Sequence, residues 1–320
     1  MGTFEVLDAG GLTTVQDLGR YGFQRYGVPV SGAMDAFALR VANLLVGNGE
    51  GDAGLEMTLA GPQLLCLANT VVAVTGGDLQ PRLDDGAAPM WEAFPVAAGS
   101  VLSFRGRRTG ARGYLGVAGG LDVPVVLGSR STYLRSRFGG IEGRALRPGD
   151  LLPAGQASGP VDVRRLPHGF LPTYIGSHTV RAVLGPQASA FTKRGVQTLL
   201  GSAYTIAAES DRMGYRLEGP AIERCAPADI ISDGTPAGAV QVPGSGVPII
   251  LLADRGTAGG YTKIAAVISA DLPRLAQSGP GDRVFFQAVT VEEAHAALRR
   301  EAAFFEELRH APTINGVGSN

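Results

Sequence analysis

The 320-residue sequence contains few of the residue types that build metal sites and disulfide frameworks, with only two lysines, two cysteines and four histidines. Cys66 lies in an apolar run, so we expect a buried structural thiol, whereas Cys225 lies in a loop-like segment. No HExxH, CxxC or EF-hand pattern occurs. These absences argue against a protein-built metal site and against a disulfide framework.

Several catalytic and targeting motifs are also missing. No GxSxG elbow and no GxxxxGK[ST] phosphate-binding loop occurs, and neither lysine follows a methionine, so we expect no covalent biotin on this chain. No apolar run approaches about 20 residues, and no signal-peptide pattern is visible, so we expect a cytoplasmic protein that does not span a membrane. The net charge of -1 gives no reason to expect a nucleic acid or an anionic membrane as a partner.

What the sequence does contain predicts a mainly β fold with a few short helices. There are 47 glycines and 20 prolines, and short β-branched or aromatic runs such as "VPIILLA" and "DRVFFQAV" lie between them. Apolar residues at helical spacing predict one helix over residues 33–48, with Gly47 at its end. A second helix should begin at Thr290, which stands in capping-box spacing with Glu293, and its apolar face should contain Ala294, Leu298, Phe305 and Leu308.

The two halves of the chain resemble each other. "SGAMD" (31–35) is similar to "SDRMG" (210–214), "LEMTLAGP" (55–62) to "RLEGP" (216–220), "VPVVLGSRST" (123–132) to "VPIILLADRGT" (247–257), and "RPGDLL" (147–152) to "GPGDRVFF" (279–286). The shared order indicates a duplicated β-rich unit. We therefore predict two barrel-like halves, at about 1–165 and 166–320, with possible strand exchange and a ligand-binding cleft at their junction.

The segment "ADRGTAGGYTK" (253–263) concentrates polar residues between two apolar runs. Gly259 and Gly260 allow a backbone nest whose N–H groups face an anion, and Lys263 adds a mobile positive charge. Asp254 is expected to orient Arg255 or to accept a proton. The alternative is a glycine-rich hairpin between two core strands, which does not explain the four polar side chains together.

Two further groups of residues are candidates for binding. In "SDRMGYRLEG", Arg212 and Arg216 flank Tyr215 at an even spacing that would place them on one side of a strand, where two guanidiniums can clamp a carboxylate or phosphoryl group. The alternative is a pair of surface arginines tied to Asp211 and Glu218. Gln241, which lies between valines, would either line the same cleft or be satisfied by the backbone.

A possible second region lies in "TTVQDLGRYGFQRYGVPVSGAMD". Asp17, Arg20 and Asp35 alternate there with glycines and aromatic residues, and a direct role in substrate binding is one interpretation. The other is structural. Asp35 would then favour the dipole of the following helix, and Asp17 with Arg20 would form an ion pair that orders the loop.

The ordered set "TTVQDLGRYG", "SGAMD", "ANLLVGN", "LEMTLAGP", "VAGGLDVPVVLGSRST", "SDRMGYRLEGP", "GAVQVP" and "LLADRGTAGGYTKIA" resembles the biotin-dependent carboxyltransferase, or allophanate hydrolase subunit 2, family, with the C subunit of 5-oxoprolinase (KipA-type) as the most similar kind of member. The resemblance runs from about residue 5 to 288 and implies cyclophilin-like β-barrels. It also implies one component of an enzyme that uses ATP and water to open 5-oxo-L-proline to L-glutamate. The partners would be the B subunit (a KipI-type protein) and the A subunit (a LamB/YcsF-type protein) of that enzyme.

The resemblance leaves alternatives open and points to particular residues. A relative could instead transfer a carboxyl group to urea from biotin on another protein, or act as a non-catalytic antagonist of a kinase inhibitor. The resemblance does not say whether ATP binds this chain or another member of the complex.

The positions matching the family motifs are Arg212, Gly214, Tyr215, Arg216, Gln241, Asp254, Arg255, Thr257, Gly259, Gly260, Tyr261 and Lys263. Asp254 and Arg255 are predicted to be catalytic. The residues predicted to bind substrate are Arg212, Tyr215, Arg216, Gln241, Thr257, Gly259, Gly260, Tyr261 and Lys263. Where the family usually has Gln-Thr-Thr after the arginine, this chain has Gly256-Thr257-Ala258, so two polar side chains are lost.

Overall fold

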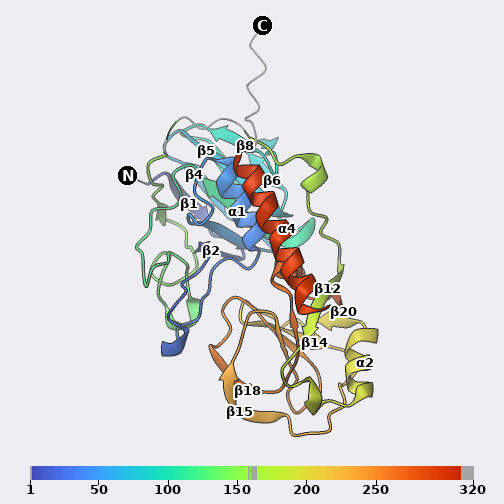
Figure 1. Ribbon diagram of the computed structural model, residues 1–320. Coiled ribbons are helices and arrows are strands. Elements are labelled where there is room, and N and C mark those ends of the chain that lie inside the picture. Colours follow the sequence, from blue (N-terminus) through green and yellow to red (C-terminus); the bar gives the residue numbers. More distant parts are fainter. Residues whose placement is uncertain (1, 158, 160–163, 311–320) are drawn as a thin grey trace. The chain divides into compact units, whose positions relative to one another are not determined.

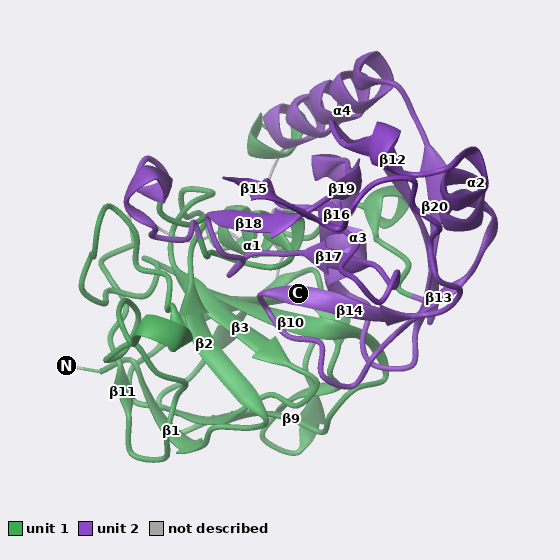
Figure 2. Ribbon diagram, turned by 90° about the horizontal axis from the view of Figure 1, so that it is seen from below, with its two compact units in different colours: residues 1–20, 31–174, 307–320 green, residues 21–30, 175–306 purple. Residues whose placement is uncertain are grey.

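The computed structural model describes residues 2–157, 159 and 164–310, which form two compact units. Unit 1 contains residues 1–20, 31–174 and 307–320 and unit 2 contains residues 21–30 and 175–306 (Figure 2). The mainly β prediction is confirmed, since most elements in Figure 1 are strands. The division into halves at 165/166 stays a prediction, because the compact units are each assembled from separate segments of the chain.

Unit 1 is built on two antiparallel sheets. The first contains, in spatial order, β11 (Leu151–Leu152), β1 (Phe4–Asp8), β4 (Gln63–Cys66), β9 (Val101–Phe104), β6 (Pro81–Leu83) and β7 (Gly86–Ala87). The second contains β2 (Leu12–Gln16), β3 (Gly54–Thr58), β10 (Thr109–Val117), β5 (Thr70–Asp78) and β8 (Ala93–Val96). One core cluster draws its apolar side chains from both sheets, among them Phe4, Leu64, Leu55 and Leu115. Cys66 belongs to this core, as predicted, whereas Cys225 is exposed.

Helix α1 (Ala36–Leu45) confirms the first predicted helix and packs against β5 and β10 of unit 1. Asp35 is its N-cap, because a carboxylate oxygen accepts a hydrogen bond from the backbone N–H of Ala38 at 2.8 Å. The helix lies so close to β10 that a Cβ on Gly116 would stand 2.8 Å from the carbonyl oxygen of Ala42. Only glycine leaves room for this contact.

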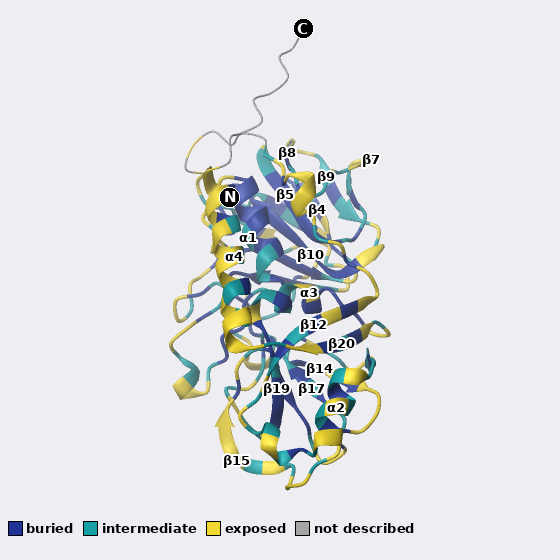
Figure 3. Cartoon of the chain, turned by 45° about the vertical axis from the view of Figure 1, so that its right-hand side comes forward, coloured by how far each residue is buried: buried dark blue, intermediate teal, exposed yellow. Residues whose placement is uncertain are grey.

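Unit 2 is a closed seven-stranded barrel, which fits the cyclophilin-like architecture that the resemblance implies. Its strands in order around the barrel are β12 (Ser177–Leu184), β19 (Lys263–Val267), β16 (Ala239–Gln241), β17 (Ile249–Leu251), β14 (Gly214–Glu218), β13 (Tyr204–Ile206) and β20 (Arg283–Ala288). All neighbours are antiparallel except β12 and β20, which are parallel. Figure 3 shows that β19 is largely buried, in contrast to the exposed strand β15.

A separate two-stranded ribbon, β15 (Asp229–Gly234) with β18 (Ala258–Tyr261), also belongs to unit 2. The remaining described elements are α2 (Lys193–Gly201), α3 (Leu272–Ala276), α4 (Val291–His310) and the 3₁₀ turns η1 (Gln24–Tyr26), η2 (Leu134–Ser136), η3 (His168–Phe170), η4 (Ala188–Ala190) and η5 (Ser269–Asp271). Within the described residues, no helix has both the length and the hydropathy needed to cross a membrane.

The C-terminal helix α4 begins with the predicted capping box. The backbone N–H of Thr290 donates to the Glu293 carboxylate at 2.8 Å, and the N–H of Glu293 donates to the Thr290 hydroxyl at 3.2 Å. Phe305 and Leu308 are buried, as predicted. The prediction was wrong for Leu298, which is 40% exposed, because the buried stripe passes through Ala297 instead.

We expect the stability of unit 2 to fall in mild acid because of His178 on β12. This imidazole is buried, and its Nε2 atom has no hydrogen-bond partner among the described residues. Burial, followed by the charge of Arg274, lowers the pKa of His178 below its ordinary value. The unfolded chain therefore takes up a proton below about pH 6.5 that the folded chain resists, so stability is full above that pH and is lost as the pH falls.

The measurement is denaturant unfolding between pH 7.5 and 5. The loss should be smaller in His178→Gln, which carries no titrating group. His295→Gln, at an exposed position on α4, should keep the loss seen in the unchanged chain. An identical pH dependence in His178→Gln and the unchanged chain would contradict the assignment.

Candidate functional site

Three loops of unit 2 enclose a cavity of about 520 Å³. Gln24, Pro29 and Val30 come from the segment 21–30, which includes the turn η1. Gly234 ends strand β15, and Thr235, Pro236 and Ala237 follow it in the connection to β16. Arg255, Gly256 and Thr257 come from the connection between β17 and β18. The volume is in the range typical of small-molecule sites.

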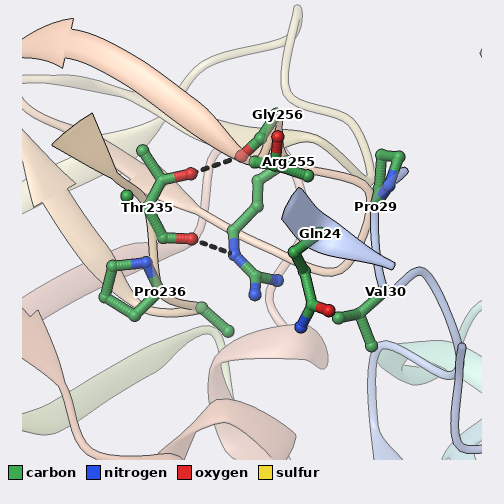
Figure 4. A pocket seen from close by; sticks show the side chains of 10 residues that line it. Gln24, Pro29, Val30, Thr235, Pro236, Arg255 and Gly256 are labelled. Atoms are coloured by element: carbon green, nitrogen blue, oxygen red, sulfur yellow. Dashed lines mark hydrogen bonds between the residues drawn. The ribbon is translucent and has the colours of Figure 1, made fainter. Parts of the chain in front are cut away.

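The Arg255 side chain is held by the backbone around it and points toward the side of the cavity formed by Gln24 (Figure 4). Its Nε atom donates to the carbonyl oxygen of Thr235 at 2.7 Å, and its Nη1 atom donates to the carbonyl oxygen of Leu252 at 3.1 Å. The Thr235 hydroxyl in turn donates to the carbonyl oxygen of Gly256. These bonds use two of the five N–H donors of the guanidinium and leave the others available.

The charge of Arg255 is not balanced locally. Among the described residues no carboxylate pairs with it, and it is the only charged residue that lines the cavity. Burial lowers the pKa of Arg255, although not enough to neutralise a guanidinium. A partly buried cation with spare donors facing a cavity is a site for a small anion, and a carboxylate matches the planar fork of a guanidinium.

Gln24 lies opposite Arg255 and is a residue that the sequence reasoning missed. Its amide oxygen accepts a hydrogen bond from the backbone N–H of Gly22 at 2.9 Å, which leaves the amide NH₂ as a donor beside the cavity. Pro29, Val30 and Pro236 supply apolar surface and were also not predicted. No spacing in the sequence connects 21–30 with 253–257, because only the tertiary fold brings these segments into one unit.

Asp254 and Arg212 belong together rather than to the cavity. Arg212 donates from Nε and Nη2 to the two carboxylate oxygens of Asp254, at 2.9 and 3.0 Å, and both side chains are buried. The N–H of Asp254 also donates to the carbonyl oxygen of Arg212 at 2.9 Å. The two residues therefore join the loop before β14 to the loop after β17, and neither is among the residues that line the cavity.

The residues of β14 are turned in different directions. Tyr215 is buried, and its hydroxyl donates to the carbonyl oxygens of Ser278 at 2.8 Å and Ala276 at 3.3 Å. Arg216, the next residue, is exposed. Because Arg212 is buried against Asp254 and Arg216 is exposed, the structure does not bring the two arginines together as a clamp.

The predicted backbone nest at Gly259 and Gly260 was wrong. Both residues lie in strand β18, where Gly259 is paired with Asp233 of β15, and neither has the left-handed backbone that a nest requires. Tyr261 ends this strand and is 40% exposed. Lys263 is not mobile either, because its buried ammonium donates to the carboxylate of Asp233 at 2.8 Å.

Gln241 and Thr257 lie near the cavity in different ways. Thr257 lines it, and its carbonyl oxygen accepts a hydrogen bond from the N–H of Thr235 at 3.2 Å. Gln241 is buried on β16, and its Nε2 atom has no hydrogen-bond partner among the described residues. A Cβ on Gly259 would stand 2.6 Å from that atom, so a larger residue there would require the Gln241 amide to shift.

The second predicted region lies in unit 1 and is a structural support. Asp17 accepts hydrogen bonds from the hydroxyl of Ser129 at 2.7 Å and the N–H of Arg130 at 2.6 Å. Arg20 is buried and donates to the carbonyl oxygen of Ser131. Both residues therefore bind the same downstream segment, while the ion pair between them that one interpretation expects stays a prediction. Asp35 is fully buried as the N-cap of α1.

No group of three or more potential metal ligands occurs among the described residues.

Asp254→Asn should destabilise unit 2 by about 3 kcal/mol, because it leaves the buried charge of Arg212 without its counter-ion. Chemical denaturation monitored by circular dichroism measures the loss. The double substitution Arg212→Met, Asp254→Leu should recover much of it, since it removes both charges. Arg216→Gln, at an exposed position of the adjacent strand, should change stability by less than about 0.5 kcal/mol. A fully stable Asp254→Asn protein would show that the pair does not hold the two loops.

Comparisons with known proteins place these features in a family. Residues 26–288 match the family model described as "Carboxyltransferase domain, subdomain A and B". The chain is 38% identical over 304 residues to the C subunit of 5-oxoprolinase from Escherichia coli, covering 95% of this chain and 97% of that protein. It is also 38% identical over 305 residues to the protein of the same name from Haemophilus influenzae, covering 95% and 97%. The crystal structure of the Kluyveromyces lactis urea carboxylase matches with a TM-score of 0.91 at 32% identity, covering 95% of this chain and 29% of that one.

Proposed function

Because this chain belongs to the carboxyltransferase domain family with subdomains A and B, we propose that it is the C subunit of an ATP-dependent 5-oxoprolinase, a multi-component enzyme that converts 5-oxo-L-proline to L-glutamate. The observation that carries the proposal is the similarity to two bacterial 5-oxoprolinase C subunits, which extends over nearly the whole length of both partners. The cavity lined by Arg255 also supports the proposal, because a guanidinium there can bind the carboxylate of the substrate.

The features of 5-oxoproline correspond to the walls of the Arg255 cavity. The substrate has one carboxylate, one lactam and a ring edge made only of methylene groups. The spare donors of Arg255 bind the carboxylate, and the amide NH₂ of Gln24 donates to the lactam oxygen. Pro29, Val30 and Pro236 pack against the ring. Two polar contacts at opposite ends of a small ring fix its orientation, which is the main contribution expected of a component that positions substrate.

The reaction needs an activated lactam. Transfer of a phosphoryl group from ATP to the lactam oxygen makes the adjacent ring carbon electrophilic, and water then adds to this carbon. Collapse of the adduct breaks the carbon–nitrogen bond, with a proton going to nitrogen, and leaves an acyl phosphate. A second water releases phosphate and glutamate. The balance is one ATP and two waters consumed, with ADP, phosphate and glutamate formed.

We propose that the other members of the complex supply the residue that transfers protons and the site that binds ATP. Of the cavity-lining residues only Arg255 is charged, and a single guanidinium suits one carboxylate better than a triphosphate. Asp254, the base predicted from the sequence, is already bonded to Arg212 through both carboxylate oxygens. We therefore assign Arg255 and Gln24 to substrate binding, and we assign proton transfer and ATP binding to the LamB/YcsF-type and KipI-type partners.

A second candidate function is carboxyl transfer that uses biotin on another protein. The observation in its favour is the close structural match to the Kluyveromyces lactis urea carboxylase. A planar acceptor such as urea also fits beside Gln24 and the carbonyl groups of the cavity. This alternative requires a biotinylated carrier and bicarbonate, and the oxoprolinase does not, so the two functions can be separated in one assay.

The test is glutamate formation from 5-oxoproline and ATP by this chain combined with its LamB/YcsF-type and KipI-type partners, each omitted in turn. We expect activity only in the complete mixture, without inhibition by avidin. Arg255→Gln should lower kcat/KM by about 10- to 100-fold, mainly through KM for 5-oxoproline, because a charge-assisted hydrogen bond to the carboxylate is lost.

Arg216→Gln is the matched control, since it removes an exposed arginine of the same unit and should leave kcat/KM unchanged. Co-purification of each variant with the partners shows that assembly is intact. Full activity of Arg255→Gln would remove the cavity from the mechanism. Turnover that needs bicarbonate and stops with avidin would favour carboxyl transfer, and a stable complex without either activity would favour a regulatory protein.

A further inference from the structure

Unit 1 contains a dense cluster of arginines that the proposed function does not use. The segment 127–150, here named the arginine loop, has an excess of three positive charges in a chain whose net charge is -1. Its arginines are Arg130, Arg135, Arg137, Arg144 and Arg147, and its carboxylates are Glu142 and Asp150. From the geometry of this loop we propose that unit 1 carries a binding site for a phosphate group, formed by Arg137 and Arg147 and supported by Arg144.

The arginine loop encloses a cavity of about 330 Å³. It is lined by Leu134, Arg137, Glu142, Gly143, Arg144, Ala145 and Arg147. Arg137 and Arg147 are exposed, and neither side chain forms a salt bridge or a side-chain hydrogen bond with any described residue. Three arginines and one carboxylate, Glu142, line the cavity, so the charge of its lining favours an anion.

The side chain of Arg144, which lies between Arg137 and Arg147 in the sequence, is held by two carboxylates. It donates from Nη1 and Nη2 to the two carboxylate oxygens of Asp150, at 2.7 and 2.9 Å, and from Nε to Glu142 at 3.0 Å. The hydrogen bonds from Arg144 lower the pKa of Asp150, so this pair stays charged at neutral pH. With Glu142 and Asp150 neutralising two charges, the three lining arginines leave an excess of one positive charge for the ligand.

The backbone of the arginine loop is strained at two residues that line the cavity. Arg137 and Glu142 have left-handed backbones, each with φ of 53°, which is rare for residues other than glycine. A Cβ on Gly143 would stand 1.9 Å from the carbonyl carbon of Arg137, so the two turns of the loop lie in direct backbone contact. This contact brings Arg137 close to the backbone that precedes Arg144, and both arginines line the same cavity.

Buried residues from the start of the chain hold this conformation. The guanidinium of Arg20 lies over the ring of Phe138, with 4.7 Å from Cζ to the ring centroid, and it donates to the carbonyl oxygen of Ser131. Asp17 accepts hydrogen bonds from Ser129 and Arg130 of the same loop. A loop held in this way loses little conformational entropy when a ligand binds, which is the property of a preformed site.

The ligand class follows from charge and size. A phosphate presents more oxygens than a carboxylate, so it can accept the paired N–H groups of both Arg137 and Arg147 at this cavity. The cavity is too small to enclose a nucleotide, so it would take inorganic phosphate or the terminal phosphate of a larger molecule that extends into solvent. The proposal does not depend on the oxoprolinase function, because no residue of the Arg255 cavity contributes to it.

The test is isothermal titration calorimetry of the full chain with inorganic phosphate, and separately with ATP, at constant ionic strength set by sodium chloride. We expect saturable binding that sulfate competes with and added chloride does not. The double variant Arg137→Gln, Arg147→Gln should weaken binding at least 10-fold, because both unpaired guanidiniums are lost. Binding of phosphate and ATP with equal affinity would identify the terminal phosphate as the whole ligand, and tighter binding of ATP would add contacts outside the cavity.

Arg135→Gln is the matched control, since it removes an exposed arginine of the same loop that does not line the cavity. It should bind phosphate like the unchanged chain, and thermal unfolding should show that all variants fold. Arg255→Gln should also bind phosphate normally, which separates this site from the cavity of unit 2. Equal weakening by Arg135→Gln, unchanged binding in the double variant, or no saturable binding of phosphate or ATP would each overturn the proposal.

Discussion

The buried ion pair between Arg212 and Asp254 determines the geometry of unit 2 around the candidate site. Its two parallel hydrogen bonds join the start of β14 to the end of β17, and Asp254 immediately precedes Arg255 in the chain. A bidentate pair fixes both distance and orientation, so it also fixes the direction in which the next side chain leaves the backbone. Such a pair costs desolvation energy and is stable only while both partners remain. The Arg255 guanidinium reaches the cavity because its neighbour is held in this way.

The sequence was sufficient for features that depend on local patterns. Three predictions were correct: the mainly β fold, the helix after Asp35 and the capping box at Thr290. These features depend on hydrogen bonding and apolar spacing within a few residues. The segment 253–263 was singled out as polar between two apolar runs; it contains strand β18, and its Arg255 lines a cavity.

Roles within that segment could not be assigned from the sequence, because they depend on which residues meet in three dimensions. Asp254 pairs with a residue 42 positions earlier and Lys263 with one 30 positions earlier, so both charges are used inside the protein. The glycines that suggested a nest serve an extended strand, where Gly259 makes room for the amide of Gln241. Composition cannot distinguish a left-handed glycine from an extended one. Gln24 was missed for the same reason, since it lies more than two hundred residues from Arg255 in the chain.

The segment 21–30 has a consequence for how this protein can be divided. If the two halves arose by duplication, they were once interchangeable units, but ten residues of the first half now belong to the compact unit formed by the second. A fragment that starts at residue 166 would form the barrel strands and yet lack one wall of the Arg255 cavity, including Gln24. Complementation by separately produced halves would then require the first fragment to donate a loop as well as to associate. The second half of the chain therefore does not contain the complete Arg255 cavity by itself.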